Sequence, residues 1–423
     1  MEIFSSYNLI IEFSVIIIIS FLFIGISKRT NIPAVLLLIF LGIGAQYLIK
    51  LSSGDLPNFL PILEILGIVG LIMIVLEAAL ELELKREKFW PILKSLAVAL
   101  IGLVASAWAA AYMLYEFIEG MTWQSAWLYA TPLSILSSAI IIPSVSGLNA
   151  GKKEFHIYES TFSDILGIMM FYFLSGQLDP SESSGAVGFA GSLVLTVVIS
   201  LVASYAIILI FQRIKSQVKL FLLIAVLLLL YALGKKMHLS SLIIILIFGL
   251  VIANMKLFFG GKLGKFLQYE KAHHIYHELH TITAETAFVV RTFFFVIFGV
   301  TIVLSDLWSG RVALVSLGII ASIYLIRFIL LRIFLGSDIL PQLFIAPRGL
   351  ITVLLFYAIP KKAQIATFEP GILLFVIIGT SLIMTGGMIY DKRRAGSAIK
   401  NAKAESVGEV KWKAPTIEEI LGQ

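Results

Sequence analysis

The sequence predicts an all-α polytopic membrane protein with about thirteen transmembrane helices. The chain has 423 residues, of which 59% are hydrophobic and 14% charged, and its mean hydropathy is +0.99. A soluble domain of this length has too little interior to bury so much apolar surface. Apolar stretches of the roughly 20 residues that cross a bilayer also recur along the whole chain.

The number of predicted spans is odd, so the two termini should lie on opposite sides of the membrane. Lysine and arginine concentrate in alternate loops, from Lys28 and Arg29 to Lys392, Arg393 and Arg394. This pattern places the N-terminus outside and the C-terminus in the cytoplasm, in the plasma membrane. The spans lie near residues 7–27, 33–50, 61–83, 91–117, 123–146, 155–176, 187–213, 217–234, 239–257, 280–304, 307–335, 338–360 and 368–390.

Composition excludes several classes of function. The net charge of +6 fits basic loops that face an anionic leaflet and requires no nucleic-acid partner. The chain has no cysteine, which excludes disulfides, thiolate metal sites and thiol nucleophiles. No nucleophile–base pair or metal-ligand set indicates an enzyme, and a channel would need a continuous polar pore, whereas one polar cluster is visible.

Two spans, the fifth and the twelfth, contain helix-breaking residues. The fifth carries Thr131-Pro132, and the twelfth carries Pro347, Arg348 and Gly349. Proline removes a backbone donor and clashes with the preceding turn. Interrupted helices at corresponding places in two halves are typical of transporters built from inverted repeats. We therefore expect two inverted repeats with crossed broken helices, formed by the first six and last six spans.

The sixth span carries the polar cluster in the stretch "YESTFSDILGIMMFYF". Glu159 and Ser163 are one helical turn apart, as are Ser160 and Asp164, so all four share one broad face. An ionised carboxylate at mid-bilayer costs about 2.5–3.5 kcal/mol on insertion scales. A basic partner, a cation or a proton can offset that cost, and a proton and an alkali cation compete for the same oxygen. Backbone groups freed at Thr131-Pro132 would lie beside them.

Intramembrane arginines complete this set. Arg291, Arg327 and Arg348 all lie in predicted spans, and each is expected to need an acid. Pairing of Glu159 with Arg327 or Arg348 would leave Asp164 free to load and unload. The alternative is that these charges form structural ion pairs between helices.

Four motifs, in order along the chain, resemble those of the monovalent cation:proton antiporters of the CPA1 type, the NhaP and NHE exchangers. They are "VLEAALELELKREKFW" (75–90), "YESTFSDILGI" (158–168), "FFFVIFG" (293–299) and "PRGLITVLLFYAIP" (347–360). The similarity extends over roughly the third to thirteenth spans. It implies sodium/proton exchange in pH homeostasis, an elevator mechanism, a homodimer, and no cofactor beyond the transported ions.

The resemblance also implies roles for individual residues. Asp164 matches the family's ion- and proton-binding aspartate, and Glu159 matches the glutamate that pairs with an arginine, here Arg327. Thr131 and Ser160 match cation-coordinating positions, so sodium is expected at Asp164, Ser160 and Thr131. Arg348 matches the arginine of the second broken helix.

Two positions depart from the family pattern. Ser163 stands where the family usually has asparagine, and Pro132 follows Thr131 directly, without the usual aspartate. Both changes remove polar groups near the site and bear on ion selectivity. One free carboxylate implies electroneutral one-for-one exchange.

The expected domain organisation follows the same resemblance. Residues 1–90 would be dimerisation or scaffold helices, 91–176 the transport core of the first repeat, 187–304 linker and scaffold helices, 307–390 the core of the second repeat, and 391–423 a short cytoplasmic tail.

Three alternatives stay open. Potassium/proton exchange differs only in the cation, whereas an antiporter-fold sensor or accessory subunit would use the acids structurally. The stretch "HHIYHELH" is a solvated interfacial helix, a pH sensor or a metal site. Its histidines are His273, His274, His277 and His280.

Overall fold

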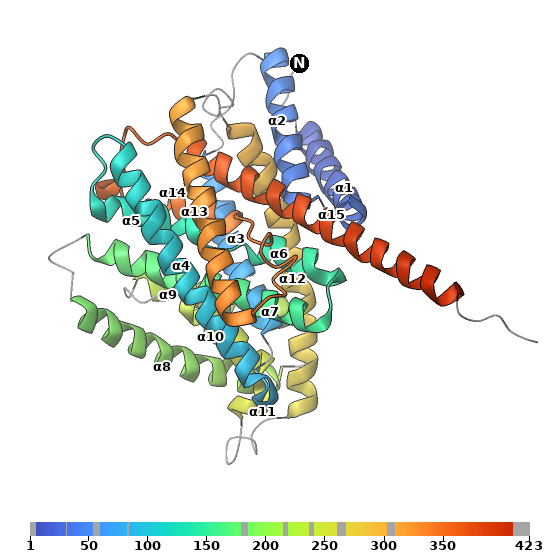
Figure 1. Cartoon of the computed structure of the whole chain (residues 1–423). Helices are drawn as coiled ribbons and strands as arrows, with labels where there is room; N and C mark the ends of the chain where they lie inside the picture. The colour runs from blue at the N-terminus through green and yellow to red at the C-terminus, as the bar shows by residue number, and fades with distance from the viewer. Residues whose placement is uncertain are drawn as a thin grey trace, which may run out of the picture.

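A computed structural model describes residues 6–30, 32–53, 60–82, 84–178, 185–214, 219–236, 241–259, 268–302 and 309–408, and these form helices and short connections (Figure 1). In the first half the helices are α1 (Ser6–Thr30), α2 (Ala34–Ser53), α3 (Leu60–Glu81), α4 (Phe89–Phe117), α5 (Trp123–Ser134), α6 (Ser138–Ser144) and α7 (Ala150–Gly176). In the second half they are α8 (Gly185–Phe211), α9 (Lys219–Lys236), α10 (Ser241–Ala253), α11 (Met255–Phe258), α12 (Tyr269–Thr301), α13 (Gly310–Leu335), α14 (Leu350–Tyr357) and α15 (Gly371–Gly408).

The predicted all-helical, multi-span architecture is confirmed. Within the described residues, eight helical segments are long and apolar enough to cross a membrane, and α10 is a shorter apolar helix. Two ends differ from expectation: α12 begins at Tyr269 rather than near residue 280, and α15 continues past Asp391 to Gly408. Residues 409–423 of the predicted tail lie outside the described part of the chain.

The helices pack in two groups. The first, called here the broken-helix group, consists of α4, α5, α6, α7, α13, α14 and α15. The second, called the α12 group, consists of α1, α2, α3, α8, α9, α10 and α12. The groups meet where α3 packs against α7 and α14. Each group therefore combines segments from both halves of the sequence.

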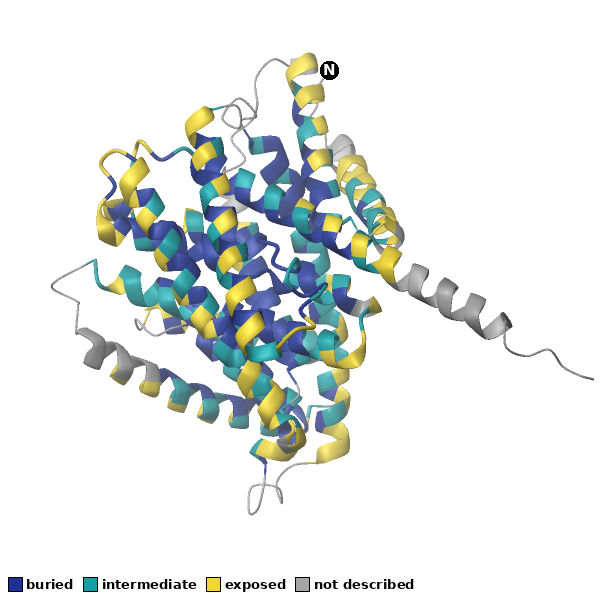
Figure 2. Ribbon diagram, viewed as in Figure 1, coloured by how far each residue is buried: buried dark blue, intermediate teal, exposed yellow. Residues whose placement is uncertain are grey.

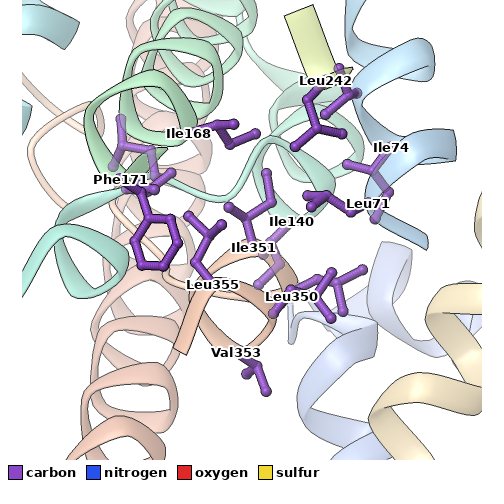
Figure 3. Close-up of a cluster of buried hydrophobic side chains, with 14 of the residues drawn as sticks. Leu71, Ile74, Ile140, Ile168, Phe171, Leu242, Leu350, Ile351, Val353 and Leu355 are labelled. Carbon is purple, nitrogen blue, oxygen red and sulfur yellow. The ribbon is translucent and has the colours of Figure 1, made fainter. Parts of the chain in front are cut away.

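An apolar cluster fills the region where the two groups meet. Figure 3 shows Leu71 and Ile74 of α3 and Leu242 of α10 facing Ile140 of α6 and Ile168 of α7. Leu350, Ile351 and Leu355 of α14 complete it. Figure 2 shows the buried residues concentrated in the interior, with exposed residues on outward helix faces. In a bilayer these outward apolar faces contact lipid. The residues that hold the helices together are therefore those buried in the interior.

Candidate functional site

Both expected helix interruptions occur. The first lies at residues 135–137, between α5 and α6, and the second is the non-helical segment 345–349 before α14. The second coincides with the predicted Pro347-Arg348-Gly349. The first corrects the prediction, because Thr131 and Pro132 lie inside α5. A proline near a helix end removes one donor while its φ stays compatible with the helix, so the helix continues to Ser134.

The two interruptions lie against each other and against α7. The N–H of Leu136 donates to Ser163 Oγ over 3.0 Å, and the N–H of Ser137 donates to the carbonyl of Pro347 over 3.0 Å. These bonds pair backbone groups that the helices leave free. Unpaired backbone groups are costly within the membrane because no water is present to bond them. A Cβ at Gly349 would overlap the side chain of Ser137, so only glycine permits this close crossing.

The polar face of α7 is buried in the interior. Glu159, Ser160, Ser163 and Asp164 are each at most 2% exposed. The helix begins after Asn149, whose side chain accepts a hydrogen bond from the N–H of Lys152. Because the four polar residues recur at i, i+1, i+4 and i+5, a single buried helix face presents all of them.

Glu159 is paired with Arg327 of α13, one of the two arginines considered for it. Nη1 donates to Oε1 over 2.7 Å and Nη2 donates to Oε2 over 3.0 Å. The remaining Nε of Arg327 donates to the carbonyl of Gln342 over 3.0 Å. This bidentate geometry matches a planar guanidinium to a carboxylate and neutralises both charges.

Asp164 has a different environment. Neither of its oxygens accepts a hydrogen bond from the described residues. Its polar neighbour is Ser138, the first residue of α6, whose hydroxyl and backbone amide face the carboxylate. A cavity of about 20 Å³ adjoins Asp164 and is lined otherwise by apolar side chains of α3, α7 and α10. The carboxylate therefore lies beside the first interruption with its oxygens available to a ligand.

Thr131 and Ser160 are buried, and their hydroxyl groups bond within their own helices. Thr131 Oγ1 donates to the carbonyl of Trp127 over 2.7 Å, and Ser160 Oγ donates to that of His156 over 2.7 Å. Among the described residues, no hydrogen bond joins either hydroxyl to Asp164. Each hydroxyl acts as the donor in its bond, and a hydroxyl oxygen also has lone pairs that can accept.

Among the residues that the structure describes, Arg348 has no acidic partner, in contrast to the expectation. Its Nε donates to the carbonyl of Leu133 over 2.9 Å, and Nη2 to that of Ser134 over 3.2 Å. Nη1 donates to the carbonyl of Ala346 over 2.6 Å. The last carbonyls of α5 have no helical donors and form the negative end of the helix dipole. They take the place of a carboxylate in satisfying this buried guanidinium.

Arg291 of α12 has two partners. Its Nη2 lies 2.9 Å from Oε2 of Glu77 on α3, and its Nη1 donates to the carbonyl of Ala139 on α6 over 3.1 Å. An acid was expected for Arg291 from the sequence, but Glu77 was not identified as that acid. The signal was weak because the two residues are far apart in the chain.

A cavity of about 690 Å³ lies between α1, α2, α6, α12 and α15. Ala139 and Arg291 are in its lining, and Ala139 directly follows Ser138, the neighbour of Asp164. The lining also includes Asp391 and Lys392 near the C-terminal end of the chain. The cavity thus extends from the side of the protein on which Asp391 and Lys392 lie to within one residue of Ser138.

The four histidines at the start of α12 form no metal site in the part of the chain that the structure describes. His280 Nε2 lies 2.9 Å from Glu81 Oε1, and His274 Nε2 lies 3.1 Å from Glu278 Oε1. The rings of His273 and His277 have centroids 4.4 Å apart. The cluster therefore belongs to the helix itself, rather than to a loop before it.

His156 was not predicted from the sequence as part of the site. This residue is completely buried, and its Nδ1 lies 3.2 Å from Glu159 Oε2. The feature of the sequence that could have identified it is its position three residues before Glu159, which puts both on the same helix face.

Comparisons with known proteins agree with this architecture. The family model described as sodium/hydrogen exchanger, transmembrane, matches residues 16–389. The fold is similar to a structure of the sodium proton antiporter MjNhaP1 from Methanocaldococcus jannaschii at pH 8. The TM-score is 0.65 at 21% identity, over 92% of this chain and 99% of that one. A second structure, an electron-microscopy map of MjNhaP1, matches with a TM-score of 0.64 at 20% identity, over 97% and 100% of the two chains. No curated protein sequence matches.

The family match spans most of the chain, and its fold agrees with the antiporter structures. The resemblance in the four motifs is thereby confirmed, as is the expectation of a transporter rather than an enzyme. This chain belongs to the sodium/hydrogen exchanger family and is a multi-pass membrane antiporter.

Proposed function

We propose that this antiporter exchanges sodium for protons, one for one, at Asp164. The observation that carries the proposal is a buried carboxylate that faces no arginine or lysine among the described residues and whose polar neighbour is Ser138, at the interruption between α5 and α6. A proton or an alkali cation can occupy such an oxygen, but the two exclude each other. Ser160, one turn away on α7, and Thr131 are the proposed additional sodium ligands.

The charge balance supports electroneutral exchange. The two neighbouring acids, Glu159 and Glu77, each face an arginine. Asp164 faces none. A single unpaired carboxylate takes up one proton or one monovalent cation in each half-cycle, so the exchange moves no net charge.

Alternating access is proposed to follow from the two packing groups. The broken-helix group carries Asp164 and would move against the α12 group, as an elevator mechanism requires. The cavity of about 690 Å³ that reaches Ala139 supplies the access route in the state seen here. Because Lys392 lines it and marks the predicted cytoplasmic end, we assign this state as facing the cytoplasm. A homodimer held by the α12 group is part of the same proposal.

The test is cation-driven proton exchange by the purified protein in proteoliposomes, with sodium, lithium and potassium offered separately. We expect sodium to drive exchange without a membrane current, and Asp164→Asn to abolish it while the variant stays folded. Normal exchange by Asp164→Asn would refute the assignment, and a current on a sodium gradient would refute the stoichiometry. Exchange driven by potassium alone would identify a potassium/proton antiporter. A folded protein that exchanges none of the three would favour the sensor or accessory alternative.

A further inference from the structure

Arg291 connects the two packing groups. It projects from α12, and its salt bridge to Glu77 of α3 lies within the α12 group. Its other bond crosses to the broken-helix group, because Nη1 donates to the carbonyl of Ala139 on α6. One side chain therefore holds the element that adjoins Asp164 against a helix of the opposite group.

The carbonyl of Ala139 needs an outside donor. In an α-helix this oxygen accepts a bond from the N–H four residues later, and that residue is Pro143, which has no N–H. An unpaired carbonyl at membrane depth is costly, so a donor from another helix stabilises it. Arg291 supplies a charged donor, which bonds more strongly than a neutral one.

Glu77 fixes the direction of that donor. Its carboxylate binds Nη2 over 2.9 Å and leaves Nη1 pointing at Ala139. The Nε of Arg291 has no partner among the described residues. The guanidinium is therefore held by two contacts, one in each packing group.

We propose that Arg291 is a positioning residue that holds α6 in the arrangement seen here and releases it when the broken-helix group moves. The helix α6 begins at Ser138, beside Asp164. The bond to Ala139 therefore keeps the cavity next to the site open toward the side of the protein on which Lys392 lies. This inference rests on the proposed function, because it assigns a regulator to the same site. Loss of the bond would favour the opposite-facing state.

The chain has no cysteine, so Ala139→Cys introduces its sole thiol while keeping the backbone carbonyl. The experiment measures the modification rate of this thiol by a membrane-impermeant methanethiosulfonate, applied from each side of oriented vesicles. With Arg291→Gln added, we expect the rate from the C-terminal side to fall and the rate from the other side to rise. A charge-assisted hydrogen bond predicts a shift of about tenfold in their ratio. Arg291→Lys, which keeps a charged donor, should restore part of the shift.

Arg311→Gln is the matched control. Arg311 also donates to a carbonyl, that of Phe117, over 3.0 Å and 2.7 Å, but both residues belong to the broken-helix group. This substitution should leave both labelling rates unchanged. A rise from the C-terminal side alone after Arg291→Gln would mean local loosening, and unchanged rates would mean no role; either result overturns the proposal.

Thiol labelling does not require transport, so the experiment can refute the role of Arg291 without refuting the proposed exchange function. Wild-type protein that exchanges no cation for protons would remove the proposed function. Exchange by the wild type, combined with rates that are insensitive to Arg291→Gln, would remove only the role of Arg291.

Discussion

Removing one partner of the Glu159–Arg327 pair should be far more damaging than removing both. The carboxylate is 1% exposed and the guanidinium 7%, and two hydrogen bonds join them over 2.7 Å and 3.0 Å. In Arg327→Met, Glu159 loses both guanidinium donors and keeps only the contact with His156 Nδ1 at 3.2 Å, and the carbonyl of Gln342 loses its donor. In Glu159→Gln, Arg327 is the uncompensated charge.

The burial of the Glu159–Arg327 pair determines how much stability each variant should lose. Breaking a buried ion pair from one side costs about 3–5 kcal/mol, because the remaining charge is left without a partner. Replacing both members with neutral side chains of similar volume is often close to neutral, so the double variant Glu159→Gln/Arg327→Met should cost about 0–2 kcal/mol. The coupling free energy between the two positions should therefore be at least about 4 kcal/mol.

The assay is the free energy of unfolding of the four proteins in detergent micelles. The control is Asp338→Asn, whose partner is Lys152 and whose side chain is 77% exposed. An exposed pair of this kind is worth about 0–1 kcal/mol. If the single variants cost less than 1 kcal/mol, or if their costs simply add in the double variant, the reasoning fails. The double variant should also retain sodium-driven exchange, since the pair compensates charge rather than binding the ion.

Two further changes test other parts of the site. Ser163→Ala removes the acceptor of the Leu136 N–H and should cost about 1–3 kcal/mol of stability. Ser95→Ala, which removes a hydroxyl bonded to its own helix, should cost less in the same measurement. A larger loss from Ser95→Ala would contradict this order. Alanine at all four histidines of α12 should shift the pH profile of exchange if they sense pH, and an unchanged profile would leave them an interfacial role. These residues are His273, His274, His277 and His280.

Local periodicity and charge made much of the fold and part of the site predictable. Apolar runs of membrane-spanning length identified the spans, and helical spacing placed Glu159, Ser160, Ser163 and Asp164 on one face. The need of a buried guanidinium for an acid led to Arg327 as one of two candidates. These inferences succeed because a single helix, or a single charge, carries the constraint.

Features that depend on tertiary hydrogen bonds were not predictable in the same way. The first interruption follows Ser134 because Leu136 and Ser137 find acceptors on α7 and in the second interruption. Proline in the sequence marked the region but not the residue at which the helix ends. Arg348 likewise bonds to carbonyls that become available only where α5 ends.

The arrangement of charges gives a physical reason for coupling under the proposed function. Glu159 and Glu77 are each paired with an arginine, and the charge of Arg348 is constant, so Asp164 is the group whose charge changes as ions bind beside the apolar cluster between the groups (Figure 3). An empty, ionised Asp164 would carry a negative charge past Leu71, Leu242 and their neighbours, which is costly in so apolar a setting. A proton or a sodium ion removes that cost equally. The broken-helix group then moves readily only when one of the two ions is bound, so sodium and protons are exchanged across the membrane.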